Sequence, residues 1–116
     1  MLIFKIFRPS EWDRLERHGQ TPGAPVDLAD GFIHFSTAEQ VRVTAEKHFA
    51  EDGDLVIAAV DTATLGQDLK WETSRGGALF PHLYRELYQA EIAWSAPLPR
   101  QGATHVFPES VGGEAA

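Results

Sequence analysis

One short segment, Leu55–Val60, is apolar at every position. A run of this length is short for a helix, and its Leu, Val, Ile and Ala residues are typical of a strand that is covered on both faces. A chain of 116 residues is long enough for such a core, because a domain of this size buries roughly two thirds of its unfolded surface. We therefore expect one domain built around a central strand at 55–60.

Strand and helix signals lie on both sides of this segment. Leu2–Phe7 is rich in β-branched and aromatic residues and is stopped by Pro9, so it predicts a first strand. A helix is expected to follow from Ser10 to Gly19, with Asp13 as the acidic half of an approximate capping box. Further strands are predicted at 32–35, 69–72 and 88–94.

A second helix is predicted directly after the strand at 32–35. Ser36 is the expected N-cap, and Glu39 stands at the capping-box position. The apolar residues that would face the core recur at helical spacing, at Ala38, Val41, Ala45 and Phe49.

Two segments carry loop signals. Residues 20–30 contain two prolines and a glycine, which favours a loop that packs through Val26 and Leu28. From Pro97 onward the composition turns to Pro, Gly, Gln and Glu. We expect a single domain over 1–100 and a mobile C-terminal tail over 101–116. Because the helices and strands do not alternate regularly, the fold class is α+β with a mostly antiparallel or mixed sheet.

The formal net charge of −7 argues against a general nucleic-acid binder, because phosphate affinity depends on clustered Lys and Arg. A few cations such as Lys5, Arg8, Arg75 or Arg85 would still suffice to hold one phosphate group. The chain has no cysteine, which fits a reducing compartment, and its N-terminus lacks the long apolar stretch of a signal peptide or membrane helix. We expect a cytoplasmic protein that does not bind membranes, and its oligomeric state stays open.

The first of two unusual motifs is Gly31–Thr37, which reads Gly-Phe-Ile-His-Phe-Ser-Thr. His34 lies just before the predicted helix, whose first N–H groups favour an anion, and the hydroxyls of Ser36 and Thr37 add donors. This arrangement suits a phosphate or a carboxylate. In the alternative interpretation, Ser36 only caps the helix and His34 is a strand histidine with satisfied hydrogen bonds.

The second motif is Gly76–Tyr84, which contains His82 among aromatic residues. A histidine there could act as an acid, a base or a hydrogen-bond donor near neutral pH, and Tyr84 could line a pocket for a flat ring. The alternative is a loop histidine bonded to a backbone carbonyl. Three carboxylates stand near this motif and could either face a ligand or simply be solvated: Glu72, Glu86 and Glu91.

Several chemistries have no support in the sequence. The chain contains no Gly-x-Ser-x-Gly elbow, no His-Glu-x-x-His motif and no P-loop. Its histidines at 34, 48 and 82 lack the spacing of metal ligands, so no metal site is expected.

Three segments resemble the bacterial domain of unknown function 952 (DUF952) family: Val26–Thr37, Val60–Asp61 and Arg75–Tyr84. The resemblance spans nearly all of residues 2–98. It implies an ADP-ribosyltransferase-like fold, in which a split, curved and mostly antiparallel sheet with flanking helices binds NAD in a cleft.

Carried over by position, the resemblance puts Lys5 on the first strand, where the transferases have His or Arg. It puts His34 at the second functional position, similar to the histidine of the tRNA 2′-phosphotransferases. Glu91 is the residue that would match the glutamate of a late strand.

The resemblance and the motifs together predict catalytic roles for His34 and His82. The ligand-binding residues are expected to be Lys5, Ser36, Thr37, Arg75 and Tyr84. The implied ligand is NAD or another phosphorylated nucleotide, and the sequence establishes no cofactor. The implied activity is a glycosyltransferase of the ADP-ribosyl or 2′-phosphotransferase type, or a degenerate relative of one. The alternatives are a non-catalytic metabolite-binding module and a purely structural role for both motifs.

Overall fold

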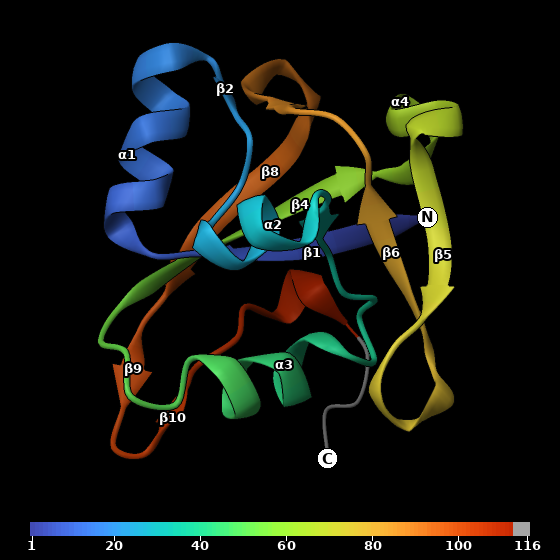
Figure 1. The fold of residues 1–116 in the computed structure, drawn as a ribbon. Helices are drawn as coiled ribbons and strands as arrows, with labels where there is room; N and C mark the ends of the chain where they lie inside the picture. The colour runs from blue at the N-terminus through green and yellow to red at the C-terminus, as the bar shows by residue number, and fades with distance from the viewer. Residues whose placement is uncertain (113–116) are drawn as a thin grey trace.

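The centre of the computed structural model is a three-stranded antiparallel sheet in the order β1–β4–β8 (Figure 1). It consists of β1 (Leu2–Phe7), β4 (Leu55–Asp61) and β8 (Ile92–Leu98). β4 lies between the other two, and its residues 57–60 are all buried, which confirms the central strand predicted from the apolar run. The structure describes residues 1–112, without the side chain of Arg75.

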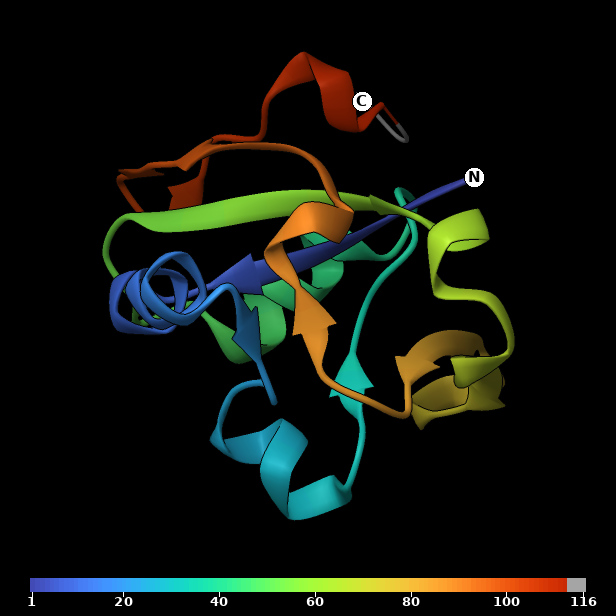
Figure 2. The ribbon, with the colours of Figure 1, turned by 90° about the horizontal axis from the view of Figure 1, so that it is seen from above.

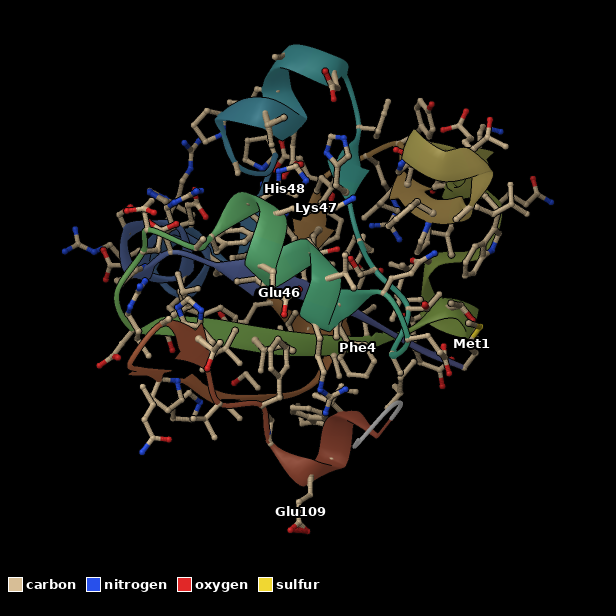
Figure 3. The ribbon with its side chains drawn as sticks, turned by 90° about the horizontal axis from the view of Figure 1, so that it is seen from below. Met1, Phe4, Glu46, Lys47, His48 and Glu109 are labelled. Atoms are coloured by element: carbon tan, nitrogen blue, oxygen red, sulfur yellow. The ribbon has the colours of Figure 1, made fainter. Side chains whose placement is uncertain are left out.

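The two faces of this sheet pack against different layers, because side chains alternate between faces along a strand. Phe4 and Ile6 of β1 pack with α3 (Val41–His48) and with the 3-10 turn η4 (Glu109–Val111). Figure 3 shows α3 in front of the sheet, and Glu109 of η4 pointing away from the rest of the molecule. Ile3 and Phe7 pack on the opposite face, with α1 (Pro9–His18) and with a second sheet.

The second sheet has the strand order β3–β6–β5 and is antiparallel throughout. Its strands are β3 (Ile33–His34), β6 (Leu79–Leu83) and β5 (Leu69–Thr73), and Figure 2 shows β3 and β6 side by side. Ile33 and Leu83 face the core between the two sheets. The opposite face of this sheet carries the two histidines of the sequence motifs.

The remaining elements are short. β2 (Gln20–Thr21) pairs with β7 (Leu87–Tyr88), and β9 (Arg100–Gln101) pairs with β10 (Thr104–His105). The others are α2 (Pro25–Asp30), α4 (Thr62–Leu65), and the 3-10 turns η1 (Gly66–Asp68), η2 (Arg75–Gly77) and η3 (Gln89–Glu91). Within residues 1–112, no helix has the length and apolar character that a membrane crossing needs. The mixed α+β class with antiparallel sheets is confirmed.

The first helix was placed within one residue of its observed ends, but its cap was assigned to the wrong acid. Glu11, and not Asp13, accepts a hydrogen bond from the backbone N–H of Arg8 through Oε1 at 2.9 Å. Asp13 instead pairs with Arg17 on the helix surface. Gly19 ends the helix as expected, with a left-handed φ of 76°.

The loop predicted over 20–30 is wrong, because this segment contains β2 and the helix α2. Pro25 occupies the first turn of α2, where its missing N–H costs nothing, and Asp27 Oδ2 accepts the N–H of Ala24 at 2.8 Å. The inward residue of α2 is Asp27, whereas Val26 and Leu28, which were expected to pack, are 58% and 57% exposed.

The second predicted helix begins later than expected. Ser36 is not an N-cap, because its backbone continues the extended chain and exchanges two hydrogen bonds with Phe4. Helix α3 starts at Val41, and the predicted apolar positions Val41 and Ala45 are buried against the central sheet.

The C-terminal part differs from the predicted pattern in two ways. The strand expected at 88–94 is divided into β7, η3 and β8. Residues 100–111, which the sequence assigned mostly to the tail, form β9, β10 and η4, and Val111 is buried in the core. The last predicted tail residues, 113–116, lie outside the described residues.

Candidate functional site

A buried carboxylate, Asp27, connects α2 to two other elements. Its side chain is fully buried, and Oδ2 lies 2.8 Å from Nζ of Lys5. Oδ1 accepts the backbone N–H of His34 at 3.1 Å and lies 2.6 Å from ring atom Nδ1 of the same residue. Burial by itself raises the pKa of this carboxyl, but the hydrogen bond with His34 and the charge and hydrogen bond of Lys5 outweigh it and lower the pKa to about 2.

Lys5 reaches Asp27 from β1, on the face of the central sheet that packs against the second sheet. The residue is 7% exposed, and Nζ also donates a hydrogen bond to the carbonyl oxygen of His34 at 3.3 Å. Lys5 was predicted to bind ligand phosphate. The structure places it behind His34, where its ammonium group balances the charge of Asp27.

His34 has a carboxylate at each ring nitrogen. Nδ1 faces Asp27, and Nε2 lies 3.0 Å from Oδ2 of Asp30, the last residue of α2. A carboxylate can only accept, so Nδ1 donates a hydrogen bond to Asp27, whereas the Asp30 oxygen lies at ion-pair distance from Nε2. The two contacts differ in setting, because Asp27 is fully buried whereas the Asp30 side chain is 46% exposed.

His82 lies on strand β6, directly opposite His34 of β3. The loop position considered as an alternative is therefore wrong. The two imidazole rings are 5.3 Å apart between centroids and nearly perpendicular, at 72°. Nδ1 of His82 lies 2.8 Å from Oε1 of Glu72 on the neighbouring strand β5, so its partner is a carboxylate and not a backbone carbonyl.

The second ring nitrogen of His82 is open. Within the described residues nothing bonds Nε2, and no fully buried side-chain nitrogen or oxygen there lacks a partner, so solvent reaches this atom. Because Nδ1 donates its proton to Glu72, the lone pair of the neutral ring is on Nε2. His82 therefore keeps an unbonded acceptor nitrogen, although the residue as a whole is only 5% exposed.

Glu72 also accepts a hydrogen bond from the hydroxyl of Tyr84 at 2.7 Å, again through Oε1. The hydrogen bonds from His82 and Tyr84 lower the pKa of Glu72. The hydrogen bond between Tyr84 and Glu72 also raises the pKa of Tyr84. Of the three carboxylates considered from the sequence, Glu72 is the one that contacts a motif histidine. Glu91 is instead bonded to Arg85, and Glu86 is exposed.

Phe32 covers the two histidines. Its ring stacks on His82 with 4.1 Å between centroids and an angle of 26°, and it lies 4.7 Å from the ring of His34 and 5.2 Å from that of Tyr84. We call Phe32, His34, Glu72, His82 and Tyr84 the histidine site. Phe32 was not predicted as a site residue, although it stands two positions before His34 and therefore on the same side of an extended chain.

Lys70 is a second residue that sequence reasoning missed. It lies on β5 opposite His82, so His34, His82 and Lys70 are in register across three strands. The signal was present in the alternation of β5, which puts Lys70 and Glu72 on one face.

Two of the predicted ligand-binding residues, Ser36 and Thr37, lie apart from the histidine site, and the structure does not describe the side chain of a third, Arg75. The Ser36 hydroxyl is 2.8 Å from the hydroxyl of Thr44, and the N–H of Thr37 donates to the side chain of Gln40. Since α3 begins only at Val41, Ser36 and Thr37 do not form the helix N-terminus that was expected to bind an anion. The side chain of Arg75 lies outside the described part of the chain.

Metal ligation and a cavity elsewhere in the molecule were also considered as features of the histidine site. Among the described residues, no group of three or more His, Cys, Asp or Glu side chains could hold a metal ion. A cavity of about 210 Å³ lies elsewhere, between α3 and the β9–β10 hairpin, and is lined by residues that include Arg42, Glu46, His105 and Phe107.

Comparison with solved structures shows close relatives of the fold. The chain is 46% identical to the crystal structure of protein CC0527 from Caulobacter crescentus, with a TM-score of 0.91 over 96% of this chain and 98% of that chain. The solution NMR structure of CC0527 is 49% identical, with a TM-score of 0.79 over 90% of each chain. A comparison with curated proteins gives no match.

The family comparison agrees with the motifs. The model of the family described as "Protein of unknown function (DUF952)" matches residues 6–95, a range that includes both histidines, Glu72 and Tyr84. The chain therefore belongs to the DUF952 family.

Proposed function

We propose that this chain is an ADP-ribosyltransferase-like enzyme that binds NAD or another phosphorylated nucleotide at the histidine site. The observation that carries the proposal is the pairing of two carboxylate-anchored histidines on adjacent strands, with Nε2 of His82 unbonded within the described residues. Histidines held in this way by a carboxylate at Nδ1 are suited to acid–base catalysis, because the partner selects the tautomer and orients the ring.

The arrangement of the sheets supports the same proposal. The strands are divided between β1–β4–β8 and β3–β6–β5, both antiparallel, and helices flank them. This agrees with the split sheet that the resemblance to ADP-ribosyltransferase-like domains implies. His34 on β3 then corresponds to the second functional position of that superfamily.

The roles follow from the contacts of each residue. With NAD as substrate, the nucleophile is a water or hydroxyl group, and its oxygen bonds to C1′ of the nicotinamide ribose. His82 Nε2 takes the proton that this nucleophile loses. The C1′–nitrogen bond breaks, and nicotinamide leaves as a neutral molecule with the bonding electrons. Glu72 stabilises the protonated His82, Phe32 and Tyr84 provide surface for a flat ring, and His34 orients the anionic part of the nucleotide.

The proposal is tested by incubating the purified protein with NAD, ADP-ribose and 2′-phosphorylated nucleotides. A ligand at about 100 times its dissociation constant should stabilise the fold by about 2.7 kcal/mol in a thermal-shift experiment. For NAD, nicotinamide release should fall by about 10²–10⁴-fold in His82→Gln, the range for loss of an acid–base group. His18→Gln, at an exposed position on α1, is the matched control and should keep full activity. Absence of binding by every nucleotide would reject the proposal.

One observation favours a second candidate, a non-catalytic metabolite-binding module. Each ring nitrogen of His34 has a carboxylate oxygen within 3.0 Å, so a carboxylate stands at both positions through which this histidine could act in catalysis. Saturable nucleotide binding without turnover would favour this candidate. If the motifs were purely structural, His34→Ala would lower stability and no nucleotide would bind.

A further inference from the structure

Three basic side chains form one row across the second sheet. His34 of β3 pairs with His82 of β6, and His82 pairs with Lys70 of β5. Residues directly opposite one another in antiparallel strands point to the same face, and neighbouring strands are about 4.8 Å apart. His34 and Lys70 therefore flank His82 at about 10 Å from each other, measured between Cα atoms. We call these three residues the basic row.

The carboxylate on His34 Nε2 differs from the one on Nδ1 in how firmly it is held. Asp27 is fully buried and bonded to Lys5 and Ala24, whereas Asp30 is 46% exposed at the end of α2. The His34 side chain is itself 35% exposed, so the Asp30 contact is at the surface. An exposed ion pair contributes little to stability, and an exposed side chain changes rotamer rapidly. Asp30 can leave His34 without disturbing the contact with Asp27.

The oxygen of Asp30 marks a position for an anion. Carboxylate and phosphate oxygens are the same kind of acceptor for an imidazolium N–H, and both prefer a short, charge-assisted bond. The Asp30 oxygen lies 3.0 Å from Nε2, which is an ion-pair distance. With Asp30 in place, a negative charge lies beside His34, and its departure removes that negative charge from the basic row.

We infer that Asp30 occupies a phosphate-binding position, and that a phosphate group of the nucleotide replaces its carboxylate at His34 Nε2. Lys70, at the other end of the basic row, contacts the same phosphate or the second phosphate of a diphosphate. Asp30 is then an internal competitor that weakens binding of free phosphate. The inference rests on the proposed function for the nucleotide, but the phosphate position is tested without any reaction.

The test measures inorganic phosphate and ADP binding by NMR, through the ring signals of His34 and the side-chain signals of Lys70. Asp30→Asn keeps the shape of the side chain and removes its charge, so phosphate should bind about five- to tenfold more tightly. Asp13→Asn is the matched control, because Asp13 is an exposed carboxylate paired with Arg17 on α1 and the change in net charge is equal. It should change phosphate affinity by less than about twofold.

The basic row gives a second set of variants. Lys70→Gln should weaken ADP binding by about three- to tenfold, the loss of one charge-assisted contact, whereas Arg17→Gln on α1 should leave it nearly unchanged. Equal phosphate affinities of Asp30→Asn and Asp13→Asn would overturn the inference. The inference would also be overturned if phosphate shifted NMR signals of the unaltered protein but not those of His34 and Lys70. This result does not depend on whether any variant folds.

The two proposals fail in different ways. Nicotinamide release by the unaltered protein, together with unchanged phosphate affinity in Asp30→Asn, removes the competitor role of Asp30 and leaves the enzyme. Tighter phosphate and ADP binding by Asp30→Asn, without turnover of any nucleotide, supports the phosphate position and removes the enzymatic proposal.

Discussion

Two carboxylates in this molecule each hold Nδ1 of a histidine, and they do so in opposite surroundings. Asp27 is fully buried and is paired with an almost buried lysine, whereas the side chain of Glu72 is 39% exposed and shares its oxygen with the hydroxyl of Tyr84. The first contact connects α2, β1 and β3. The second stays within β5, β6 and the residue that follows β6.

This difference separates stability from chemistry. Removing Asp27 would leave a buried ammonium without its counter-charge and two backbone N–H groups without an acceptor, so its loss affects the whole fold. Removing Glu72 leaves no buried charge without a counter-charge. Its loss should therefore change the tautomer and orientation of His82 while the fold remains. Each of the following experiments compares the two carboxylates.

The largest effect is expected from Asp27→Ala. Breaking a buried ion pair from one side costs about 3–5 kcal/mol, because the remaining charge stays buried and unpaired. Urea denaturation should therefore show a large loss for Asp27→Ala, and a loss below about 1 kcal/mol for Glu72→Ala. Adding Lys5→Met to Asp27→Ala should recover part of the loss, because it removes the unpaired charge. Equal losses for the two alanine variants would contradict the comparison.

Gly23→Ala tests how closely the chain is packed around Asp27. Gly23 has a φ of +110°, and an added Cβ would stand 2.5 Å from both Cβ and Oδ2 of Asp27. Backbone strain and overpacking together should cost about 2–3 kcal/mol. Gly31→Ala is the control, because its φ of +86° carries similar strain but its Cβ would meet no atom within 4 Å. A loss no greater than that of Gly31→Ala would show that the Asp27 side chain can move aside.

The pH dependence of stability should depend on Asp27. Its pKa is about 2 in the folded protein, below the ordinary 3.8, so the unfolded chain binds more protons between these values. Stability is thus fully present above the unfolded pKa and falls by about 2 kcal/mol as the pH drops from about 4 to about 2. Denaturation in this range should show the drop in the unaltered protein and in Glu72→Gln. Persistence of the full drop in Asp27→Asn would assign it to other groups.

The smallest change in stability is expected for Glu72→Gln, within about 0.5 kcal/mol. The effect should be local instead. Since Glu72 raises the pKa of Tyr84, the variant should bring that pKa down toward 10.0, as measured by the ultraviolet absorbance of the phenolate. Nitrogen NMR of His82 should show loss of the fixed tautomer. Glu86→Gln, an exposed carboxylate on the segment after β6, should change neither signal.

The parts of the fold that the sequence predicted are those with local signals. β1, β4 and α1 follow from apolar runs, from the position of Pro9 and from the glycine at the end of the helix. α2 was missed because Pro22, Gly23 and Pro25 favour a loop, whereas Pro25 is in fact the start of a helix whose first turn is capped by Asp27. The capping group is itself held by Lys5, which is distant in sequence.

The candidate site was predicted as two histidines and not as a network. His34 and His82 were found because each stands out within its motif, and their partners are separated from them by 7 and 10 residues in the chain. Lys70 and Glu72 enter the site through the register of β5 against β6, which a single sequence does not give. Phe32 lies in the first motif, and Asp27 and Asp30 lie in the segment Val26–Thr37 that carries the family resemblance, but the sequence assigned none of them a role.

The contact between Lys5 and Asp27 also has a kinetic consequence. Lys5 belongs to β1, whose partner strand β4 is about 55 residues away in sequence, so its native position is complete only when this long-range pairing has formed. Contacts of such long range form late, because the entropy of loop closure is lost before they contribute. We therefore expect the ring signals of His34 to reach their native values in the last phase of refolding, so that this histidine reports when the chain has completed its fold.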